Sequence, residues 1–306
     1  MTARVYEWLR RLTSILLLSL GATLAVSAQE MEPRAYSRAP IGTQFVVLTY
    51  AYQTGDVLTD ASLPLRDVKV KLNSAVLGYG RTFNLAGRQA SLGFAAPYIK
   101  ARVRGTVFEE QQLVTRSGLG DARVRFTMNL KGSPALTPKE FAAYKPKPVL
   151  GVSFTVAAPS GQYDPARLVN LGSHRWAFKP ELGYSRPVRR WTLEVAGGAW
   201  FFTPNNNFFG GAHRSQRPLL SIQGDVVYTL RRRMWISFNG TYYRGGQTVV
   251  NGTANNDRQA NSRIGVTYSL PLTQRQSLKV AWARGVTTRL GSSLDTVVVG
   301  WQYTWF

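Results

Sequence analysis

The chain has 306 residues, a formal net charge of +22 and no cysteine. The lack of cysteine excludes a disulfide-stapled scaffold and a cysteine-ligated zinc site. In a cytosolic protein this positive charge would indicate a nucleic-acid partner. The class of partner that the charge indicates therefore depends on whether the chain is exported.

The first thirty residues carry the signals of an export sequence. A basic region with three arginines precedes the apolar stretch 15–26, and small residues follow it up to Ala28. This order is typical of a secretory signal peptide, and the apolar stretch is too short to span a membrane comfortably as a helix. We therefore predict a signal peptide over residues 1–28 and a single mature domain over residues 29–306.

Export changes the meaning of the positive charge. Removal of residues 1–28 takes three arginines and one glutamate from the total of +22 and leaves +20. An exported protein with this charge is expected to meet an anionic small substrate or a negatively charged lipid surface, and no nucleic acid.

The mature sequence alternates between apolar and polar residues with a period of two, which predicts strands with one apolar and one polar face. In a clear example, Ile236 and Phe238 alternate with Ser237 and Asn239. The pattern predicts about twelve strands, near residues 44–53, 68–82, 88–104, 119–132, 147–158, 174–187, 190–203, 216–230, 233–246, 258–271, 276–286 and 295–306. The third segment loses its phase after Pro97, where we expect a bulge or the exposed end of the strand. No segment of the mature chain predicts a helix.

The connections between these strands alternate in length. Four are short, basic and turn-like: FNLAGR, RPVRR, LRRRM and PLTQRQ. Longer connections rich in Gly, Asn, Asp and Ser lie at residues 53–67, 105–117, 159–173, 204–215, 246–257 and 286–294. The connection at 133–146 is long where the alternation requires a short one.

Strands of about ten residues, an even strand count and alternating turns and loops are typical of a membrane β-barrel, whose closed sheet leaves no unpaired edge in lipid. The sequence therefore predicts an all-β fold: a transmembrane antiparallel up-and-down β-barrel in the bacterial outer membrane, with the short turns and both termini in the periplasm. A secreted, water-soluble β-sandwich stays open as the alternative, because its strands also have one apolar face.

Aromatic residues recur near the predicted strand ends, as in the interfacial girdles of membrane barrels. The candidate girdle residues are Tyr50, Tyr184, Trp191, Trp200, Trp235, Tyr242, Trp301, Trp305 and Phe306. The aromatic end of the last strand resembles the signal read by bacterial barrel-assembly machinery, which we expect as a partner during biogenesis. Phe306 lies one residue out of step with the apolar row, so either the strand end is bulged or Trp305 takes part of this role.

Several stretches resemble the phenol meta-pathway degradation family of outer-membrane proteins, which are often described as transporters. They include SGLGDARVRF (117–126), APSGQYDP (158–165), GGAWFFTPNNNFFGG (197–211) and DRQANSRIGVTYSLPL (257–272). The resemblance covers most of the mature chain from residue 44 onward, and it departs from the family at His174, where we would expect Asn. It implies a barrel with a transport function and leaves the substrate open.

The polar rows of the predicted strands supply the candidate pore-lining residues. These are Lys69, Lys71, Arg123, Arg125, Arg175, Lys179, Glu181, Glu194, Asp225, Arg263 and Lys279. Rings of basic residues along a pore favour anions. The alternative is that the charges pair across strands and fill a narrow lumen, because a barrel of about twelve strands lies between filled small barrels and open porins.

The sequence does not predict an enzyme. Its two histidines, His174 and His213, lie in or beside predicted loops and belong to no Ser/His/Asp grouping. Neither a phosphate-binding motif nor a metal-ligand spacing occurs in the mature chain, so we expect no cofactor and no metal.

These patterns predict an outer-membrane channel for passive diffusion of small molecules, anionic or aromatic compounds among them. The expected partners are outer-membrane lipid, lipopolysaccharide and a small-molecule substrate of unknown identity. Two alternatives stay open: a closed barrel with a structural or surface-binding role through its long extracellular loops, and a lipid-modifying outer-membrane enzyme.

Overall fold

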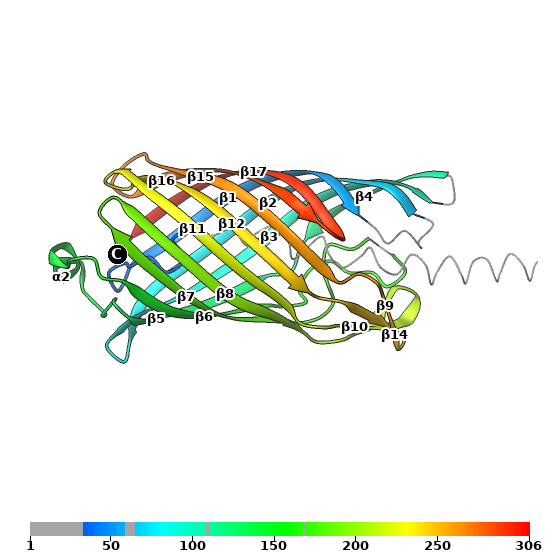
Figure 1. Cartoon of the computed structure of the whole chain (residues 1–306), viewed down its shortest axis with the longest axis horizontal. Helices are drawn as coiled ribbons and strands as arrows, with labels where there is room; N and C mark the ends of the chain where they lie inside the picture. The colour runs from blue at the N-terminus through cyan, green and yellow to red at the C-terminus, as the bar shows by residue number, and fades with distance from the viewer. Residues whose placement is uncertain (1–32, 59–64, 108–109, 168) are drawn as a thin grey trace, which may run out of the picture.

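The computed structural model describes residues 33–58, 65–107, 110–167 and 169–306, so the predicted signal peptide lies outside the described residues. The fold is an all-β closed antiparallel barrel (Figure 1), in which β1 (Gln44–Leu58) pairs with β17 (Gly291–Trp305). The barrel sheet has 13 strands, of which β4 (Glu110–Leu119) and β5 (Arg123–Lys131) share one position because both pair with β3 (Arg88–Val107). The barrel therefore has the predicted twelve strand positions.

The remaining barrel strands follow one another as antiparallel neighbours. They are β2 (Leu65–Leu85), β6 (Val149–Ala157), β7 (Ala177–Val188), β8 (Trp191–Phe202), β11 (Leu219–Arg231), β12 (Met234–Gly245), β15 (Gln259–Pro271) and β16 (Gln276–Thr288). The expectation of a loop at 105–117 is wrong for most of its length, because β4 pairs with β3 from Tyr98↔Leu119 to Val107↔Glu110. Among the described residues, no helix is both long and apolar enough to cross a membrane.

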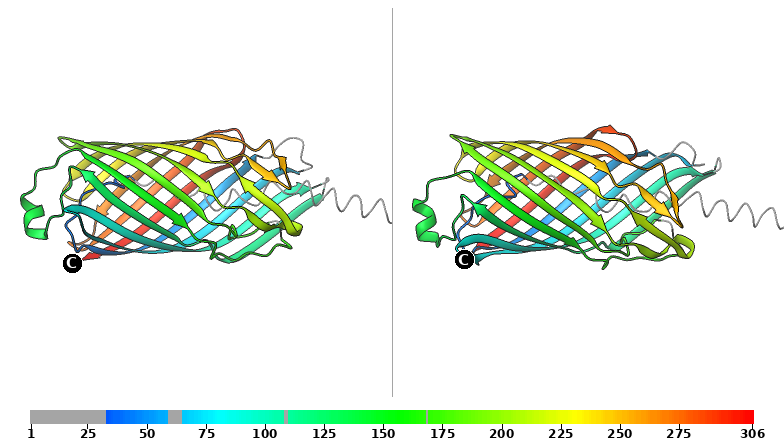
Figure 2. Two further views of the ribbon diagram at one scale, coloured as in Figure 1. Left: turned by 90° about the horizontal axis from the view of Figure 1, so that it is seen from below. Right: turned by 60° about the horizontal axis from the view of Figure 1, so that its bottom comes forward.

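The two ends of the barrel differ in their connections (Figure 2). One end, here called the turn end, holds the C-terminus and tight turns such as Ala86–Gly87, whose φ angles are 50° and 75°. The other end, the loop end, holds a small sheet of β9 (Asn205–Phe208), β10 (Ala212–Gln216), β13 (Thr248–Val250) and β14 (Thr253–Ala254), with the short 3₁₀ helix η2 (Phe209–Gly211). In outer-membrane barrels the short turns face the periplasm and the longer loops face outward.

The expectation of no helix is wrong for the connection at 133–146, which contains α2 (Pro138–Ala143) at the turn end. Thr137 caps this helix, and the Glu140 carboxylate accepts a hydrogen bond from the Thr137 backbone N–H at 2.8 Å. The capping box and Pro138 stabilise a helix that is too short to show an apolar period. The helix accounts for the one long connection on the side of the short turns.

Along the middle of the barrel, the wall has an apolar outer face and a polar inner face, as predicted. On β12, Phe238 is 56% exposed, whereas Ser237 and Asn239 face inward and are buried. Exposed apolar side chains recur on the outer faces of the neighbouring strands β11 and β15, at Ile222 and Ile264. An outer face of this kind is favourable in lipid and unfavourable in water, which argues against the soluble β-sandwich.

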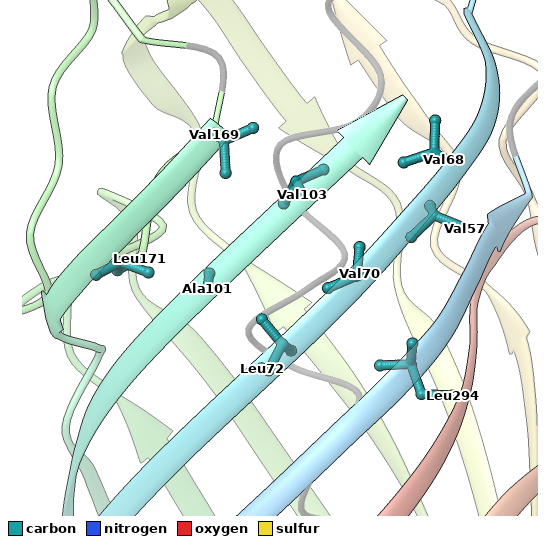
Figure 3. Packing of buried hydrophobic residues seen from close by; sticks show 9 residues of the cluster. All are labelled: Val57, Val68, Val70, Leu72, Ala101, Val103, Val169, Leu171 and Leu294. Atoms are coloured by element: carbon teal, nitrogen blue, oxygen red, sulfur yellow. The ribbon is translucent and has the colours of Figure 1, made fainter. Parts of the chain in front are cut away.

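At the loop end of β2, the polarity of the two faces is reversed. Val68, Val70 and Leu72 are at most 5% exposed and point into the barrel (Figure 3), whereas Lys69 and Lys71 are exposed on the outer face. The prediction that Lys69 and Lys71 line the lumen is therefore wrong. With 21 residues, β2 is much longer than a membrane crossing requires, so its outer face near this end meets water.

The same reversal explains the loss of phase in β3. Of the two options for this segment, a bulge or an exposed strand end, the pairing with β2 does not support the bulge, because β3 stays in register with β2 from Lys69↔Arg104 to Leu85↔Arg88. Leu92 and Phe94 are exposed on the outer face before Pro97, and Arg102 and Arg104 occupy that face after it. The segment beyond Pro97 is thus the exposed end of the strand.

Two of the nine candidate girdle residues do not lie on the outer face. Trp200 and Trp235 are 2% and 5% exposed and lie inside the barrel, so the girdle prediction is wrong for them. Trp235 shares its parity with the inward Ser237, and Trp200 shares its parity with the inward Glu194. The other seven lie on the outer face or at its edge: Tyr50, Tyr184, Trp191, Tyr242, Trp301, Trp305 and Phe306.

The end of β17 is not bulged. Its register with β1 runs without a shift to Gln44↔Trp305, and Phe306 follows the strand with 68% of its surface exposed. The Trp305 ring lies 5.7 Å from Tyr303 and 6.3 Å from Tyr79, measured between ring centroids. Of the two options for this terminus, the geometry favours Trp305 as the last residue of the outer apolar row.

Candidate functional site in the barrel lumen

An N-terminal segment, residues 33–43, enters the lumen from the turn end. Its Tyr36 is 3% exposed and lies against two glycines that face each other on β6 and β7, Gly151 and Gly183. A Cβ atom added at Gly183 would lie 1.9 Å from the Tyr36 ring, so the absence of a side chain makes room for it. Sequence reasoning missed this segment, because it has no apolar period, and the paired inward glycines are the one signal that could have indicated it.

Tyr36 contacts a cluster of charged side chains inside the lumen. Its hydroxyl donates a hydrogen bond to the Glu181 carboxylate at 2.9 Å. The same carboxylate lies 3.0 Å from the Arg125 guanidinium and 2.8 Å from the Lys179 ammonium. Three predicted pore-lining residues are thus brought together, and one acid partly neutralises two bases.

Two further predicted acids, Glu194 on β8 and Asp225 on β11, lie directly opposite each other. Glu194 accepts hydrogen bonds from the Ser185 hydroxyl at 2.7 Å and from the Arg34 backbone N–H at 2.6 Å. Asp225 accepts from the side-chain amides of Gln223 and Asn239. Hydrogen bonds from neutral donors satisfy these carboxylates, so they still contribute negative charge at the turn-end side of the lumen.

The connection between β6 and β7 folds into the barrel from the loop end. Asp121 holds it, because its carboxylate accepts hydrogen bonds from the backbone N–H groups of Gly161 and Ser173, each at 2.9 Å. Two apolar residues of this connection, Val169 and Leu171, pack inside the barrel (Figure 3) in a cluster with seven wall residues: Val57, Val68, Val70, Leu72, Ala101, Val103 and Leu294. This packing explains why the inner face of the wall is apolar at the loop end.

A cavity lies between this connection and the barrel wall. Its charged lining residues are Asp121, Arg123 and Arg175. Its apolar lining includes Leu72, Ile99, Leu171 and Phe202. The cavity therefore combines an apolar surface with two positive charges and one negative charge, a lining suited to a small molecule with an apolar body.

The predicted pore-lining residues other than Lys69 and Lys71 lie inside the barrel, in separate groups. Arg125, Lys179 and Glu181 form one cluster, and Arg123 and Arg175 line the cavity. Arg263 donates a hydrogen bond to Thr296 at 3.0 Å, and the Lys279 ammonium lies 6.0 Å from the centre of the Trp235 ring. Sequence reasoning did not select the partly buried Arg34 or the buried residues Tyr36, Gln53 and Arg214.

The two histidines form no catalytic grouping in the part of the chain that the structure describes. The His174 ring stacks on Tyr163 with 4.7 Å between centroids, and His213 is exposed on β10. No group of three or more potential metal ligands occurs among the described residues. These positions offer no support for hydrolytic or metal chemistry.

Comparison with known proteins identifies the family of the chain. A family model described as "Putative MetA-pathway of phenol degradation" matches residues 47–299. The chain belongs to this family. Among curated proteins, no relative matches.

This member of the phenol-degradation family also resembles solved structures in its fold. The COG4313 outer membrane channel from Pseudomonas putida F1 is 21% identical, with a TM-score of 0.78 over 90% of this chain and 100% of that chain. The transport unit of the autotransporter AIDA-I from Escherichia coli is 12% identical, with a TM-score of 0.54 over 92% of this chain and 95% of that chain. The chain thus has the fold of an outer-membrane channel.

Proposed function

We propose that the mature protein, exported by a signal peptide over residues 1–28, is an outer-membrane channel for passive diffusion of small molecules, with a preference for anions. The observation that carries this proposal is the excess of base over acid inside a closed barrel. The inward bases are Arg123, Arg125, Arg175, Lys179, Arg263 and Lys279, against the inward acids Asp121, Glu181, Glu194 and Asp225. A positive lumen attracts anions and repels cations.

A conductance measurement with two matched variants tests the proposal. The mature chain is inserted into planar bilayers, and the reversal potential is recorded in asymmetric salt. Arg123→Gln with Arg263→Gln removes two charges from the lumen, and Lys69→Gln with Lys71→Gln removes two from the outer face. We expect the first variant to lose anion selectivity and the second to retain it. Equal selectivity in both variants, or a barrel that never conducts, would overturn the proposal.

The filled lumen favours a second candidate, a closed barrel with a structural or surface-binding role. Tyr36 occupies the turn-end half, and Val169 and Leu171 occupy the loop end. If this candidate holds, the folded barrel stays silent in bilayers even after the N-terminal segment, residues 33–43, is displaced. Openings that appear only on displacement would instead support a gated channel.

We also propose that the loop end of β2 and β3 contacts the phosphates of lipopolysaccharide. Lys69 lies directly opposite Arg104, and Lys71 lies opposite Arg102. All four side chains are exposed on the outer face. Like charges in directly opposed positions destabilise a sheet unless an anion lies between them, and the outer leaflet supplies phosphate at this height. These four residues are called the basic ladder below.

For biogenesis, we propose that the barrel-assembly machinery reads the outer row of β17. Trp301, Tyr303 and Trp305 lie on one face of this strand, which closes the barrel against β1. Trp305→Ala is expected to lower the amount of folded barrel in the membrane more strongly than Phe306→Ala, measured by heat-modifiable mobility in gels. A larger loss from the Phe306 variant would assign the signal to the terminal residue.

A further inference from the structure

Two arginines are buried at the loop end, close to the cavity. Arg175, just before β7, is 4% exposed, and Arg214, on β10, is 3% exposed. Each guanidinium lies over an aromatic ring: Arg175 is 4.3 Å from the centre of Phe202, and Arg214 is 4.8 Å from the centre of Phe208. Burial of two positive charges is costly unless an anion or a carboxylate compensates them.

Gln216 brings these two arginines to one place. Its side-chain oxygen accepts a hydrogen bond from Arg175, and its side-chain nitrogen donates to the Gly246 carbonyl at 2.8 Å. Gln216 and Arg214 are two residues apart on β10, so their side chains leave the same face of the strand about 7 Å apart. The two guanidinium groups therefore lie near each other, and Arg175 lines the cavity.

The carboxylates near these arginines are engaged elsewhere. Asp121 binds the connection between β6 and β7, and its bonds to Ser173 include one from the hydroxyl at 2.5 Å. Asp257 accepts from the backbone N–H and the hydroxyl of Thr248, at 2.8 and 2.5 Å. Both acids influence the arginines through space without bonding to them. Among the described residues, neither guanidinium therefore has a carboxylate as a direct partner, although both acids act on the arginines at longer range.

The donor atoms that lack a partner form a recognisable edge. Within the described part of the chain, Arg214 has no hydrogen-bond partner at Nε or Nη2, and Arg175 has none at Nη1. The Nε and Nη2 atoms of one guanidinium are the side-on pair that binds the two oxygens of a carboxylate. The third donor belongs to Arg175, whose guanidinium is hydrogen-bonded to Gln216, two residues from Arg214 on β10.

The groups stay charged at neutral pH. Burial, and to a lesser extent the neighbouring Arg214, lower the pKa of Arg175 to about 9. Burial lowers the pKa of Arg214 to about 10. Both values lie above 7, so both side chains attract an anion under physiological conditions.

We propose that Arg175 and Arg214 form a binding subsite for the carboxylate of a small molecule whose body is apolar and about the size of one ring. The rings of Phe202 and Phe208 flank the guanidinium groups, and the adjoining cavity has apolar walls that include Ile99 and Leu171. A strongly hydrated inorganic anion would lose its water against such walls without compensation. The subsite deepens the proposed function, because it names the class of molecule that the channel takes up.

Calorimetric titration of benzoate into the full mature barrel in detergent tests the subsite. We expect binding that is at least tenfold weaker in Arg175→Gln and in Arg214→Gln. The matched control is Arg244→Gln, which removes an exposed arginine from the outer face of β12 and should bind benzoate as the unaltered protein does. Benzyl alcohol, which has the ring without the charge, and acetate, which has the charge without the ring, should each bind at least tenfold more weakly than benzoate.

Three results would overturn the subsite: no benzoate binding to the unaltered barrel, unchanged binding in both lumen variants, or inorganic phosphate binding more tightly than benzoate. Should the Gln variants fail to fold, Arg214→Lys keeps the charge and loses the side-on pair, so weaker benzoate binding is still expected. The titration is independent of conductance. A silent barrel that binds benzoate would retain the subsite and lose the channel, whereas a conducting barrel that does not bind it would lose the subsite alone.

Discussion

At the scale of single residues, Glu181 holds the charges of the lumen together. Its carboxylate is close to Arg125, Lys179 and the Tyr36 hydroxyl, at distances of 3.0, 2.8 and 2.9 Å. The side chains of Glu181 and Lys179 are only 11% and 10% exposed, so solvent screens this ion pair weakly. Removal of the acid leaves the buried Lys179 and the partly buried Arg125 without their shared partner.

We expect Glu181→Gln to destabilise the barrel by about 3 kcal/mol, the usual cost of breaking a buried ion pair. The variant also removes one negative charge from the lumen, so anion selectivity should rise. Reversible urea unfolding in lipid vesicles measures the first effect, and the reversal potential in asymmetric salt measures the second.

A matched control for this prediction is Asp295→Asn, which breaks the exposed pair between Asp295 and Arg284. Its side chains are 45% and 64% exposed, and such surface pairs contribute about 0–1 kcal/mol. Equal destabilisation by the two substitutions would contradict the central role of Glu181.

At the scale of elements, the N-terminal segment and the glycines beneath it form one unit. Tyr36 fits because Gly151 and Gly183 lack side chains at the point of contact. Its hydrogen bond to Glu181 then ties the segment to the wall. The segment therefore obstructs the turn-end half of the lumen for as long as this contact persists.

We expect Gly183→Ala to displace the N-terminal segment and to raise single-channel conductance. The new methyl group would lie 1.9 Å from the Tyr36 ring. This distance is too short for a contact, and a methyl group cannot rotate away, so the ring has to move. Gly224→Ala on β11 is the control, since a Cβ atom there would meet nothing within 4 Å. Tyr36→Ala should reproduce the gain by removing the obstruction from the other side. Unchanged conductance in both Gly183→Ala and Tyr36→Ala would show that this segment does not limit the pore.

The strands of the barrel could be predicted from sequence, and the segments that fill it could not. A strand such as β12 can be predicted from its own residues. From Ile236 to Tyr242, apolar side chains that face lipid alternate with polar side chains that face the lumen. Tyr36 and Leu171 carry no such local pattern, because their positions depend on distant partners such as Gly183 and Leu72. The parity of Trp235 predicts an inward side chain, because it matches that of Ser237. The girdle prediction instead follows the preference of tryptophan for the membrane surface.

At the scale of the whole molecule, the barrel has two zones along its axis. In the middle, apolar residues face outward and polar residues face inward. At the loop end of β1–β3, apolar residues pack inward on the β6–β7 connection, and the outer face carries the basic ladder. The errors at Lys69 and Lys71 and the loss of phase after Pro97 have this one cause: period two predicts that the faces differ, and the height of the membrane decides which face is apolar.

This division predicts that the basic ladder acts on lipid and leaves the lumen unchanged. The variant Lys69→Gln, Lys71→Gln, Arg102→Gln, Arg104→Gln should bind lipopolysaccharide at least tenfold more weakly in a titration monitored by native mass spectrometry. Each basic residue near an anionic surface contributes about 1 kcal/mol, so a tenfold loss is a conservative expectation for four. Its ion selectivity in bilayers should match that of the unaltered protein.

The turn end offers a control of equal charge. Arg189, Arg190, Arg231 and Arg232 are exposed there, and their replacement by Gln removes the same four charges at the opposite end of the barrel. The outer leaflet alone holds lipopolysaccharide, so this variant should bind it as the unaltered chain does. Equal losses in the two variants would mean that net charge, and not the opposed pairs of the ladder, determines lipid binding. An altered ion selectivity in the ladder variant would instead show that Lys69 and Lys71 lie along the pathway of the ions.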